Sequence, residues 1–451
     1  MVLAQNATPQ KTSLLSLGML KKMPNLIKGD NMYILFKNAR ILTMENPNIF
    51  HGCLLVKDNK IEYVGKDQVF PFHIDKIIDC NGNLLMPGFK NAHAHTAMVF
   101  ARSHADNLPL QEWLFDNIIP MEEKLTPEFV YELTKCGILE YLTSGITSCF
   151  DMYYYPESIA RASVDMGFRN VILSSSTNED ISIHRNRILQ SKNNSLVTYK
   201  LGLHAEYTSS IEDIKRMSSL ANELKIPMYL HVSETQKEVD DCVKRNGMRP
   251  IEFLDSLGVF NYGGGAYHSV YLSNNEIEIC QRKHIDIITC PGSNLKLASG
   301  IAPINKYFNS GLRISIGTDG ASSNNSLNIF KEMYLTSCLQ KVINKDPSVM
   351  DGYDVLKFAT VNSALTMGLN DCDILAKGKL ADIIMIDLTK PSMQPINNII
   401  NNLVYSGSKD VIKMTMIDGK ILYYDGKFNL PFSKEEIYSS TQKIADLLKK
   451  K

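Results

Sequence analysis

The sequence predicts an α/β protein in which a (β/α)8 barrel of the TIM type carries a small β-sandwich domain built from both chain ends. The first observation is that eight short apolar runs alternate with polar stretches of helical pattern, as parallel βαβ units do. Second, eight such units within about 235 residues suit a closed barrel. Third, both ends of the chain carry short β-rich runs. A doubly wound open sheet is the alternative that this spacing allows.

The β-rich runs at the two ends read as strands separated by turn residues. Those near the amino end are Met32–Leu42, Gly52–Asp58 and Lys60–Val64. Those near the carboxyl end are Ala381–Leu388, Val411–Asp418 and Lys420–Asp425, with Asp418-Gly419 as a hairpin turn signal. We expect these runs to form one β-sandwich domain from residues 32–86 and 380–430.

The barrel is expected to occupy residues 87–379, entered by a strand that starts just before them. The eight buried strands are predicted at Leu84–His93, Ile146–Asp151, Asn170–Ser175, Tyr199–His204, Pro227–Val232, Gly264–His268, Ile285–Cys290 and Leu312–Thr318. Polar helical stretches follow several of them, for example Ile211–Leu224 and Asn275–Lys283. The longest connection follows the first strand and contains Ala101–Pro120 and a predicted helix, Pro127–Thr143. Such a loop lies over the barrel mouth, where substrates bind.

The two termini differ from the rest of the chain. Residues 1–29 contain no Asp or Glu and no long apolar segment, so a secretory signal is not expected. We predict a flexible extension for residues 1–31. At the other end, residues 431–451 contain a charged amphipathic helix, Ser433–Lys451.

Composition excludes several classes of protein. The 451 residues include 48 Lys and Arg against 48 Asp and Glu, and this balance argues against a nucleic-acid or membrane-surface partner, both of which require a basic surface. No apolar run approaches the ~20 residues that span a bilayer. The nine cysteines include no C-x-x-C pair. We expect a soluble cytoplasmic protein with free thiols and a small-molecule substrate.

Five of the ten histidines fall at or just after the ends of predicted strands, and the eighth strand is followed by Asp319. The five are His93, His95, His204, His231 and His268. His93 and His95 are two residues apart, so on an extended strand both rings reach the same side. Three imidazoles with one carboxylate make a zinc set that leaves room for water. Taken alone, His231 also fits a buried histidine bonded to a carbonyl, and Asp319 a turn residue.

The segments around these residues resemble the amidohydrolase superfamily, and within it the cytosine/adenosine-type deaminases. They are Pro87–His95, His231–Thr235, Ala266–His268, Ser293–Gly300, Gly317–Gly320 and Gly378–Asp382. The likeness runs from about Tyr33 to Asp425 and implies a distorted (β/α)8 barrel with a small β-sandwich. It differs from the zinc deaminases with a C-x-x-C motif, which this chain lacks.

The segment Leu108–Leu114 is similar to the 5′-methylthioadenosine/S-adenosylhomocysteine deaminases in particular. That resemblance implies that Glu112 binds ribose hydroxyls, beside Trp113, and that His204 contacts the substrate. The alternative is that Glu112 and Trp113 belong to an amphipathic loop helix. Relatives that take S-adenosylhomocysteine often carry an arginine after the third strand, where this chain has Ser174–Ser176. This departure favours methylthioadenosine or adenosine.

The resemblance implies one Zn²⁺ per subunit, with Fe²⁺ or Mn²⁺ as other candidates. Its ligands are His93, His95, His231 and Asp319. A single ion is expected because His204 stands where two-metal members have a bridging lysine, while Lys200 lies four residues upstream.

The implied reaction is hydrolytic deamination of an adenine nucleoside (5′-methylthioadenosine, S-adenosylhomocysteine or adenosine) to an inosine-type product and ammonia. In this hypothesis Asp319 takes a proton from water, Glu234 protonates ring nitrogen N1, and His268 orients the attacking oxygen. Alternatives are a deaminase of another purine, a pterin or a cytosine-like base, and an amidohydrolase of ring amides or chlorotriazines. A noncatalytic scaffold is the alternative from another class. Relatives are often oligomers, so a homo-oligomer is expected.

Overall fold

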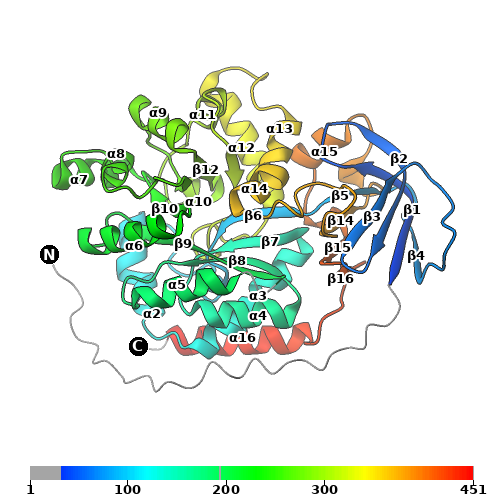
Figure 1. Cartoon of the computed structure of the whole chain (residues 1–451), viewed down its shortest axis with the longest axis horizontal. Helices are drawn as coiled ribbons and strands as arrows, with labels where there is room; N and C mark the ends of the chain where they lie inside the picture. The colour runs from blue at the N-terminus through cyan, green and yellow to red at the C-terminus, as the bar shows by residue number, and fades with distance from the viewer. Residues whose placement is uncertain (1–31, 192–194, 450–451) are drawn as a thin grey trace.

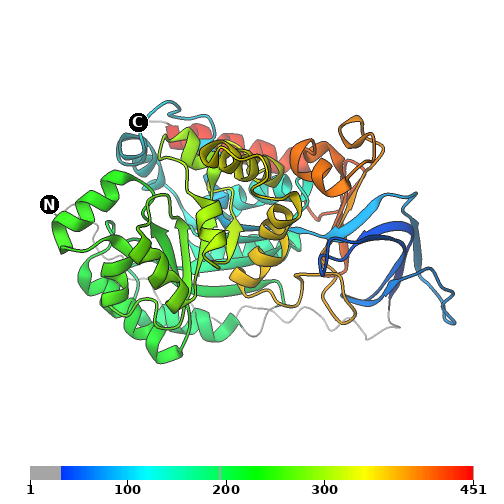
Figure 2. The ribbon, with the colours of Figure 1, turned by 90° about the horizontal axis from the view of Figure 1, so that it is seen from above.

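The computed structural model describes residues 32–191 and 195–449. It contains an eight-stranded parallel sheet rolled into a barrel and a nine-stranded mixed sheet beside it (Figures 1 and 2). The extension predicted for residues 1–31 lies outside the described residues, as do the last two residues of the predicted terminal helix. The domain boundaries given above stay a prediction.

The barrel strands follow one another in chain order. They are β6 (Phe89–Ala94), β7 (Ile146–Asp151), β8 (Arg169–Ser174), β9 (Val197–Ala205), β10 (Met228–Val232), β11 (Gly264–His268), β12 (Ile285–Thr289) and β13 (Ile314–Ile316). Just after β13, the N–H groups of Thr318 and Asp319 donate to the carbonyl of His93 at 3.1 and 3.0 Å. These bonds nearly close the sheet, so the predicted barrel is confirmed and the open sheet is excluded.

Helices cover the outside of the barrel (Figure 1). They include α3 (Pro127–Thr143), α4 (Pro156–Met166), α5 (Ile181–Gln190), α6 (Ile211–Leu224), α7 (Gln236–Asn246), α8 (Pro250–Ser256), α9 (Asn274–Lys283), α10 (Pro291–Lys296), α11 (Ile304–Asn309), α12 (Ile329–Asn344), α13 (Gly352–Lys357) and α14 (Ser363–Met367). Side chains of Thr126, Ser210 and Ser273 cap α3, α6 and α9, which explains why these helices begin at or next to the predicted residues. The terminal helix α16 (Lys434–Lys449) packs along α3.

Strands from both chain ends form the second sheet, as predicted. Its strands are β1 (Tyr33–Leu42), β2 (Ile49–Lys57), β3 (Lys60–Gly65), β4 (Lys76–Asp79), β5 (Leu84–Pro87), β14 (Ile383–Ile386), β15 (Ile412–Ile417), β16 (Lys420–Tyr424) and β17 (Lys427–Phe428). β5 joins the two ends, because it pairs with β1 on one side and with β14 on the other.

The single strand predicted at Leu84–His93 is wrong, because the chain changes sheets at Gly88. The Gly88 N–H donates to the carbonyl of Asp382 at 3.0 Å, and a Cβ on Gly88 would lie 2.1 Å from the Thr147 side chain. Only a residue without a side chain fits this close approach. The apolar run therefore supplies β5 to the small sheet and β6 to the barrel.

A buried group of charges, which we call the lower charge cluster, joins the amino-terminal ends of β6 and β8 to the small sheet. It consists of Lys90, Arg169 and Asp382. The Arg169 Nε and Nη2 atoms donate to Asp382 at 2.7 and 3.0 Å, and the Lys90 Nζ donates to the Thr147 hydroxyl at 2.6 Å. Burial by itself raises the pKa of Asp382, but Arg169 outweighs burial and holds that pKa below its ordinary value.

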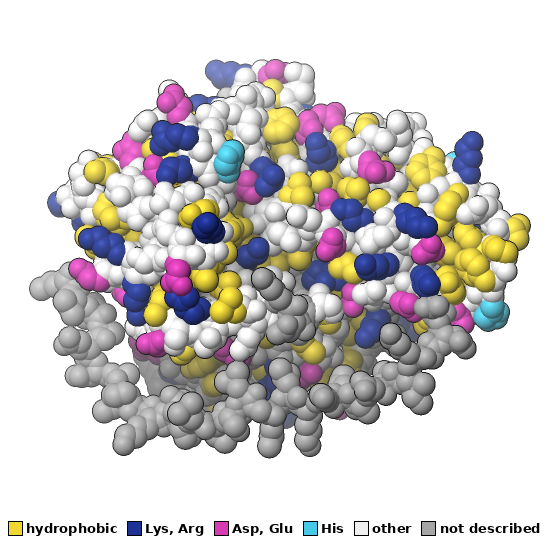
Figure 3. Space-filling view, in the orientation of Figure 1, with side chains coloured by type: hydrophobic (Ala, Val, Ile, Leu, Met, Phe, Trp, Pro, Cys, Tyr) yellow, Lys and Arg dark blue, Asp and Glu magenta, His cyan; other side chains and the backbone are white. Residues whose placement is uncertain are grey.

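The interior and the surface agree with the composition. Aromatic side chains including Phe150, Tyr229 and Tyr267 fill the barrel interior, and all nine cysteines are free thiols, most of them buried. On the face shown in Figure 3, basic and acidic side chains are interspersed. Within the described ranges, the helices are too short or too polar to cross a lipid bilayer.

Candidate metal centre and active site

The predicted site residues lie at the carboxyl-terminal ends of the barrel strands, where barrel enzymes carry their chemistry. His93 is on β6, and His95 follows that strand directly. His231 and His268 are on the adjacent strands β10 and β11, with His231 opposite Tyr267 in the parallel register. Asp319 follows β13, the strand that meets β6.

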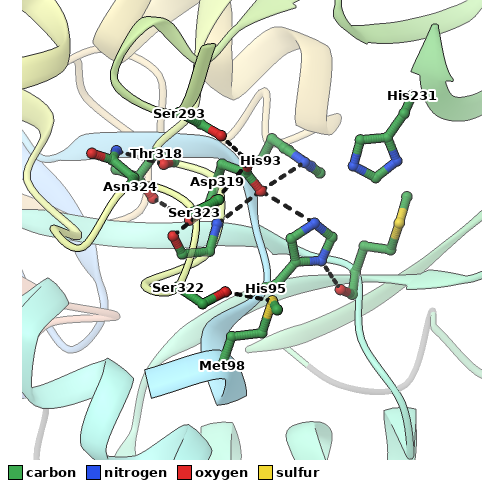
Figure 4. A network of polar contacts seen from close by, with 12 residues as sticks. His93, His95, Met98, His231, Ser293, Thr318, Asp319, Ser322, Ser323 and Asn324 are labelled. Carbon is green, nitrogen blue, oxygen red and sulfur yellow. Dashed lines mark hydrogen bonds and ion pairs between the residues drawn. The ribbon is translucent and has the colours of Figure 1, made fainter. Parts of the chain in front are cut away.

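The four predicted metal ligands are brought together (Figure 4). The Asp319 Oδ1 atom lies 3.2 Å from the His95 Nε2 atom and 3.6 Å from the His93 Nε2 atom. The ring centre of His231 is 4.7 Å from that of His93 and 5.5 Å from that of His95. One set of ligand atoms within 4.8 Å of one another comes from His93, His95 and Asp319, and a second from His93, His231 and His268.

These residues fit a bound transition metal. Both ring nitrogens of His93 are buried and have no hydrogen-bond partner among the described residues, which is costly for a polar group that binds nothing. Burial holds the pKa of His93 and of His231 well below the ordinary value, so each ring is neutral and one of its two nitrogens has a lone pair that can coordinate a metal. The Nδ1 atoms of His95 and His231 contact the backbone carbonyls of Met152 and His204, as metal-bound histidines do.

Asp319 is held in place by its neighbours. Its Oδ2 atom accepts hydrogen bonds from the hydroxyls of Ser293 and Ser323 at 2.6 and 2.8 Å, and Oδ1 accepts the Gly320 N–H at 2.8 Å. A Cβ at Gly317 would lie 2.7 Å from the His93 Cβ atom, so a glycine is required where the end of β13 approaches β6. Asp319 is thereby oriented with Oδ1 toward the histidines.

A second pair lies beside the predicted ligands. The Glu234 Oε2 atom is 3.8 Å from the His268 Nε2 atom, and the Ser299 hydroxyl donates to the other carboxylate oxygen at 3.4 Å. Burial raises the pKa of Glu234 above its ordinary value. His268 is oriented by Asn294, whose Oδ1 atom is 2.8 Å from the His268 Nδ1 atom. A carboxyl with a raised pKa next to an imidazole is suited to proton transfer.

His204 also lies at this rim. Its ring centre is 4.7 Å from that of His231, and its Nδ1 atom contacts the Thr208 hydroxyl at 3.0 Å. Burial lowers the pKa of His204 to about 4, so the ring is neutral at pH 7. The Lys200 amine lies next to Gly368 instead. The predicted single-metal site is consistent with this arrangement.

The structure does not bring Glu112 or Trp113 into contact with the histidines. Glu112 is exposed at the end of a short turn, and its carboxylate has no hydrogen bond or ion pair within residues 32–191 and 195–449. Trp113 is buried in the main hydrophobic core, where it begins a π-helical turn, Trp113–Ile118. Their substrate-binding roles stay predictions.

Two carboxylates near the site were not predicted from the sequence, the half-buried Glu122 and the buried Glu238. Glu122 accepts a hydrogen bond from the Tyr153 hydroxyl at 2.7 Å, and burial raises its pKa to about 7. Glu238 accepts two backbone N–H bonds beside Glu234. Glu122 lies in the long first connection and carries no local signal. Glu238 had one, because Thr235 and Glu238 have the spacing of a helix capping box.

The segment Ser174–Ser176 has a cation beside it that the sequence did not indicate. The Arg187 Nη1 atom on α5 donates to the Ser174 hydroxyl at 3.1 Å. The same guanidinium is bound by two carboxylates, since its Nε atom donates to Glu157 at 2.6 Å and its Nη2 atom to Glu179 at 2.7 Å. This arginine is therefore already neutralised by the protein.

The chain is similar to known proteins over most of its length. Residues 84–422 match the Amidohydrolase family. The chain is 34% identical over 423 residues to a 5-methylthioadenosine/S-adenosylhomocysteine deaminase of Pyrococcus furiosus, covering 92% of this chain and 100% of that protein. It is 38% identical over 428 residues to a 5′-deoxyadenosine deaminase of Methanobrevibacter smithii, covering 92% and 98%.

Among solved structures, the chain is similar to an adenosine deaminase from Xanthomonas campestris with bound zinc. The TM-score is 0.87 at 28% sequence identity, covering 92% of this chain and 98% of that one. The likeness therefore extends over both sheets, including the strands that carry the histidines.

Proposed function

Because this chain belongs to the amidohydrolase family, we propose that it deaminates an adenine nucleoside with an uncharged 5′ substituent, such as 5′-methylthioadenosine, 5′-deoxyadenosine or adenosine. The observation that carries the reaction type is the Glu234–His268 pair beside the set of metal ligands. The relatives named above act on adenine-type nucleosides by their names.

In the proposed mechanism, His93, His95, His231 and Asp319 would hold the metal. A zinc ion at such a site lowers the pKa of a bound water to about 7, which supplies a nucleophile at neutral pH. Asp319 accepts the proton of the water through Oδ1.

Glu234 and His268 act on the purine side of the site. Glu234 donates a proton from its carboxyl to ring nitrogen N1. His268 uses its Nε2 atom to orient the oxygen that adds to C6. Asp319 then passes its proton to the amino group on C6, and the C6 hydroxyl gives its proton back to Glu234. The C6–N bond breaks, ammonia leaves, and an inosine-type product with a carbonyl at C6 remains.

The test of the acid role is Glu234→Gln. The variant should bind metal as the wild type does and should lose about 100- to 10,000-fold in kcat. In the wild type, kcat should fall as the pH rises through the raised pKa of Glu234, because the acid is then deprotonated. Near-normal turnover by Glu234→Gln at full metal content would contradict this role.

The preference for an uncharged 5′ substituent rests on Arg187. An S-adenosylhomocysteine carboxylate needs a free cation, and the guanidinium nearest Ser174 already binds Glu157 and Glu179. Ammonia release should be measured from methylthioadenosine, 5′-deoxyadenosine, adenosine, S-adenosylhomocysteine and guanine side by side. The three uncharged nucleosides should give the higher kcat/KM values. A preference for S-adenosylhomocysteine or for guanine would refute the assignment.

A further inference from the structure

Helices α7 and α9 begin with the same sequence pattern but use it differently. In α9 the Ser273 hydroxyl accepts the Glu276 N–H, and the Glu276 carboxylate accepts the Ser273 N–H at 2.8 Å. This reciprocal pair is a capping box. In α7 the Thr235 hydroxyl accepts the Glu238 N–H at 3.1 Å, which is the first half of the same device. The Glu238 carboxylate, however, does not return to the Thr235 N–H.

The Glu238 carboxylate instead binds the two residues before the cap. Its Oε1 atom accepts the Ser233 N–H at 2.7 Å, and its Oε2 atom accepts the Glu234 N–H at 2.8 Å. Ser233 has a φ of 53°, a left-handed conformation that costs energy for a residue with a Cβ. The Glu238 side chain is buried, so water does not compete for these two short hydrogen bonds. They hold a strained turn in place.

That turn separates His231, a predicted metal ligand, from Glu234. We propose that Glu238 is a positioning residue for deamination. By holding the N–H groups of Ser233 and Glu234, it directs the Glu234 carboxyl toward His268 and the purine N1. This inference rests on the proposed role of Glu234 as the acid. Within the described residues, the Glu238 carboxylate hydrogen-bonds these two N–H groups and not the side chains of the predicted metal ligands.

The first experiment is Glu238→Gln, with Glu276→Gln as the matched control. A glutamine side chain has one acceptor oxygen and one NH₂ group, whereas the Glu238 carboxylate accepts two N–H bonds. One of the two backbone N–H groups therefore faces the NH₂ group and loses its hydrogen bond. Glu238→Gln should lower kcat by about 10- to 100-fold, with KM and metal content unchanged. Glu276→Gln removes a bond of the same kind one βα unit further along, and should leave kcat unchanged. A purely structural role predicts equal, small effects on kcat in both variants.

The second experiment combines the substitutions. If Glu238 acts through Glu234, adding Glu238→Gln to Glu234→Gln should not lower kcat further, since coupled residues are not additive. A further loss equal to that in the single variant would overturn the proposal. If Glu238→Gln does not fold, Glu238→Asp is compared with Glu276→Asp by the same criteria. Near-normal turnover by Glu234→Gln alone would overturn the acid role first, which separates the two failures.

Discussion

The two ends of the barrel bury ionisable groups in opposite ways. At the amino-terminal end, Arg169 donates to both oxygens of Asp382. At the carboxyl-terminal end, both ring nitrogens of His93 are buried close to Asp319, and no group in the described part of the chain forms a hydrogen bond with them. The charges of an ion pair are neutralised within the protein. Buried ring nitrogens without a partner, in contrast, are available to bind a metal ion or another ligand. The presence or absence of an internal partner for the buried ionisable groups therefore distinguishes the end of the barrel that stabilises the fold from the end proposed to be reactive.

The largest effect is expected from Asp319→Asn at the reactive end. An amide cannot accept the proton of the water, and it is a poorer ligand for a metal ion. We expect kcat to fall by at least about 1,000-fold. The thermal midpoint without added metal should fall less than in Arg169→Met, because Asp319 loses its contact with His95 while the lower charge cluster is intact. Steady-state kinetics, metal analysis and a melting curve measure the three quantities. A kcat within tenfold of the wild-type value, which corresponds to about 1.4 kcal/mol in the activation free energy, would contradict this assignment.

Arg169→Met should have the reverse outcome. It leaves the Asp382 carboxylate buried without its cation, which costs about 3–5 kcal/mol in the free energy of unfolding. Activity per folded molecule should remain, because Arg169 lies at the opposite end of the barrel from His93. Urea unfolding and kinetics on the same preparation check both parts. A variant as stable as the wild type would show that this ion pair does not stabilise the protein.

The pH dependence of stability sharpens the same contrast. Arg169 holds the pKa of Asp382 low against the effect of burial, so the unfolded chain binds the proton more readily. The stabilisation is therefore fully present above the unfolded pKa of about 3.9 and is lost as the pH falls through the lower folded value. The difference in unfolding free energy between the wild type and Arg169→Met should narrow as the medium becomes more acidic. If the difference in unfolding free energy does not change with pH, the proposed stabilisation of Asp382 by Arg169 is refuted.

The smallest effect is expected from Lys90→Met. The Lys90 amine has the neutral Thr147 hydroxyl as its hydrogen-bond partner, and Arg169 still neutralises Asp382 in its absence. Because methionine fills a similar volume, the free energy of unfolding should change by no more than about 1 kcal/mol. Urea unfolding beside Arg169→Met gives the comparison. A loss as large as that of Arg169→Met would place Lys90 at the centre of the cluster.

Much of the candidate site could be predicted because barrel strands all end at one rim. His93 and His231 lie at the ends of predicted strands and Asp319 directly follows one, so their convergence required no knowledge of distant contacts. The break at Gly88 could not be predicted in this way, because it depends on Asp382, far along the chain. Glu238 stood at a recognisable capping position, but its actual partners depend on the left-handed backbone of Ser233. The local sequence pattern therefore predicts the strands and helices, whereas the break at Gly88 and the partners of Glu238 depend on contacts that the pattern does not contain.

The position of β5 between β1 and β14 has a consequence for synthesis of the protein on the ribosome. The edge of β5 that pairs with β14 has to wait for a partner about 300 residues downstream, which takes about 15–60 s at ordinary translation rates. During that time the nascent chain presents an open, apolar strand edge, a known route to aggregation. Chaperone demand should therefore peak late in translation and end when the strand at Ile383–Ile386 emerges.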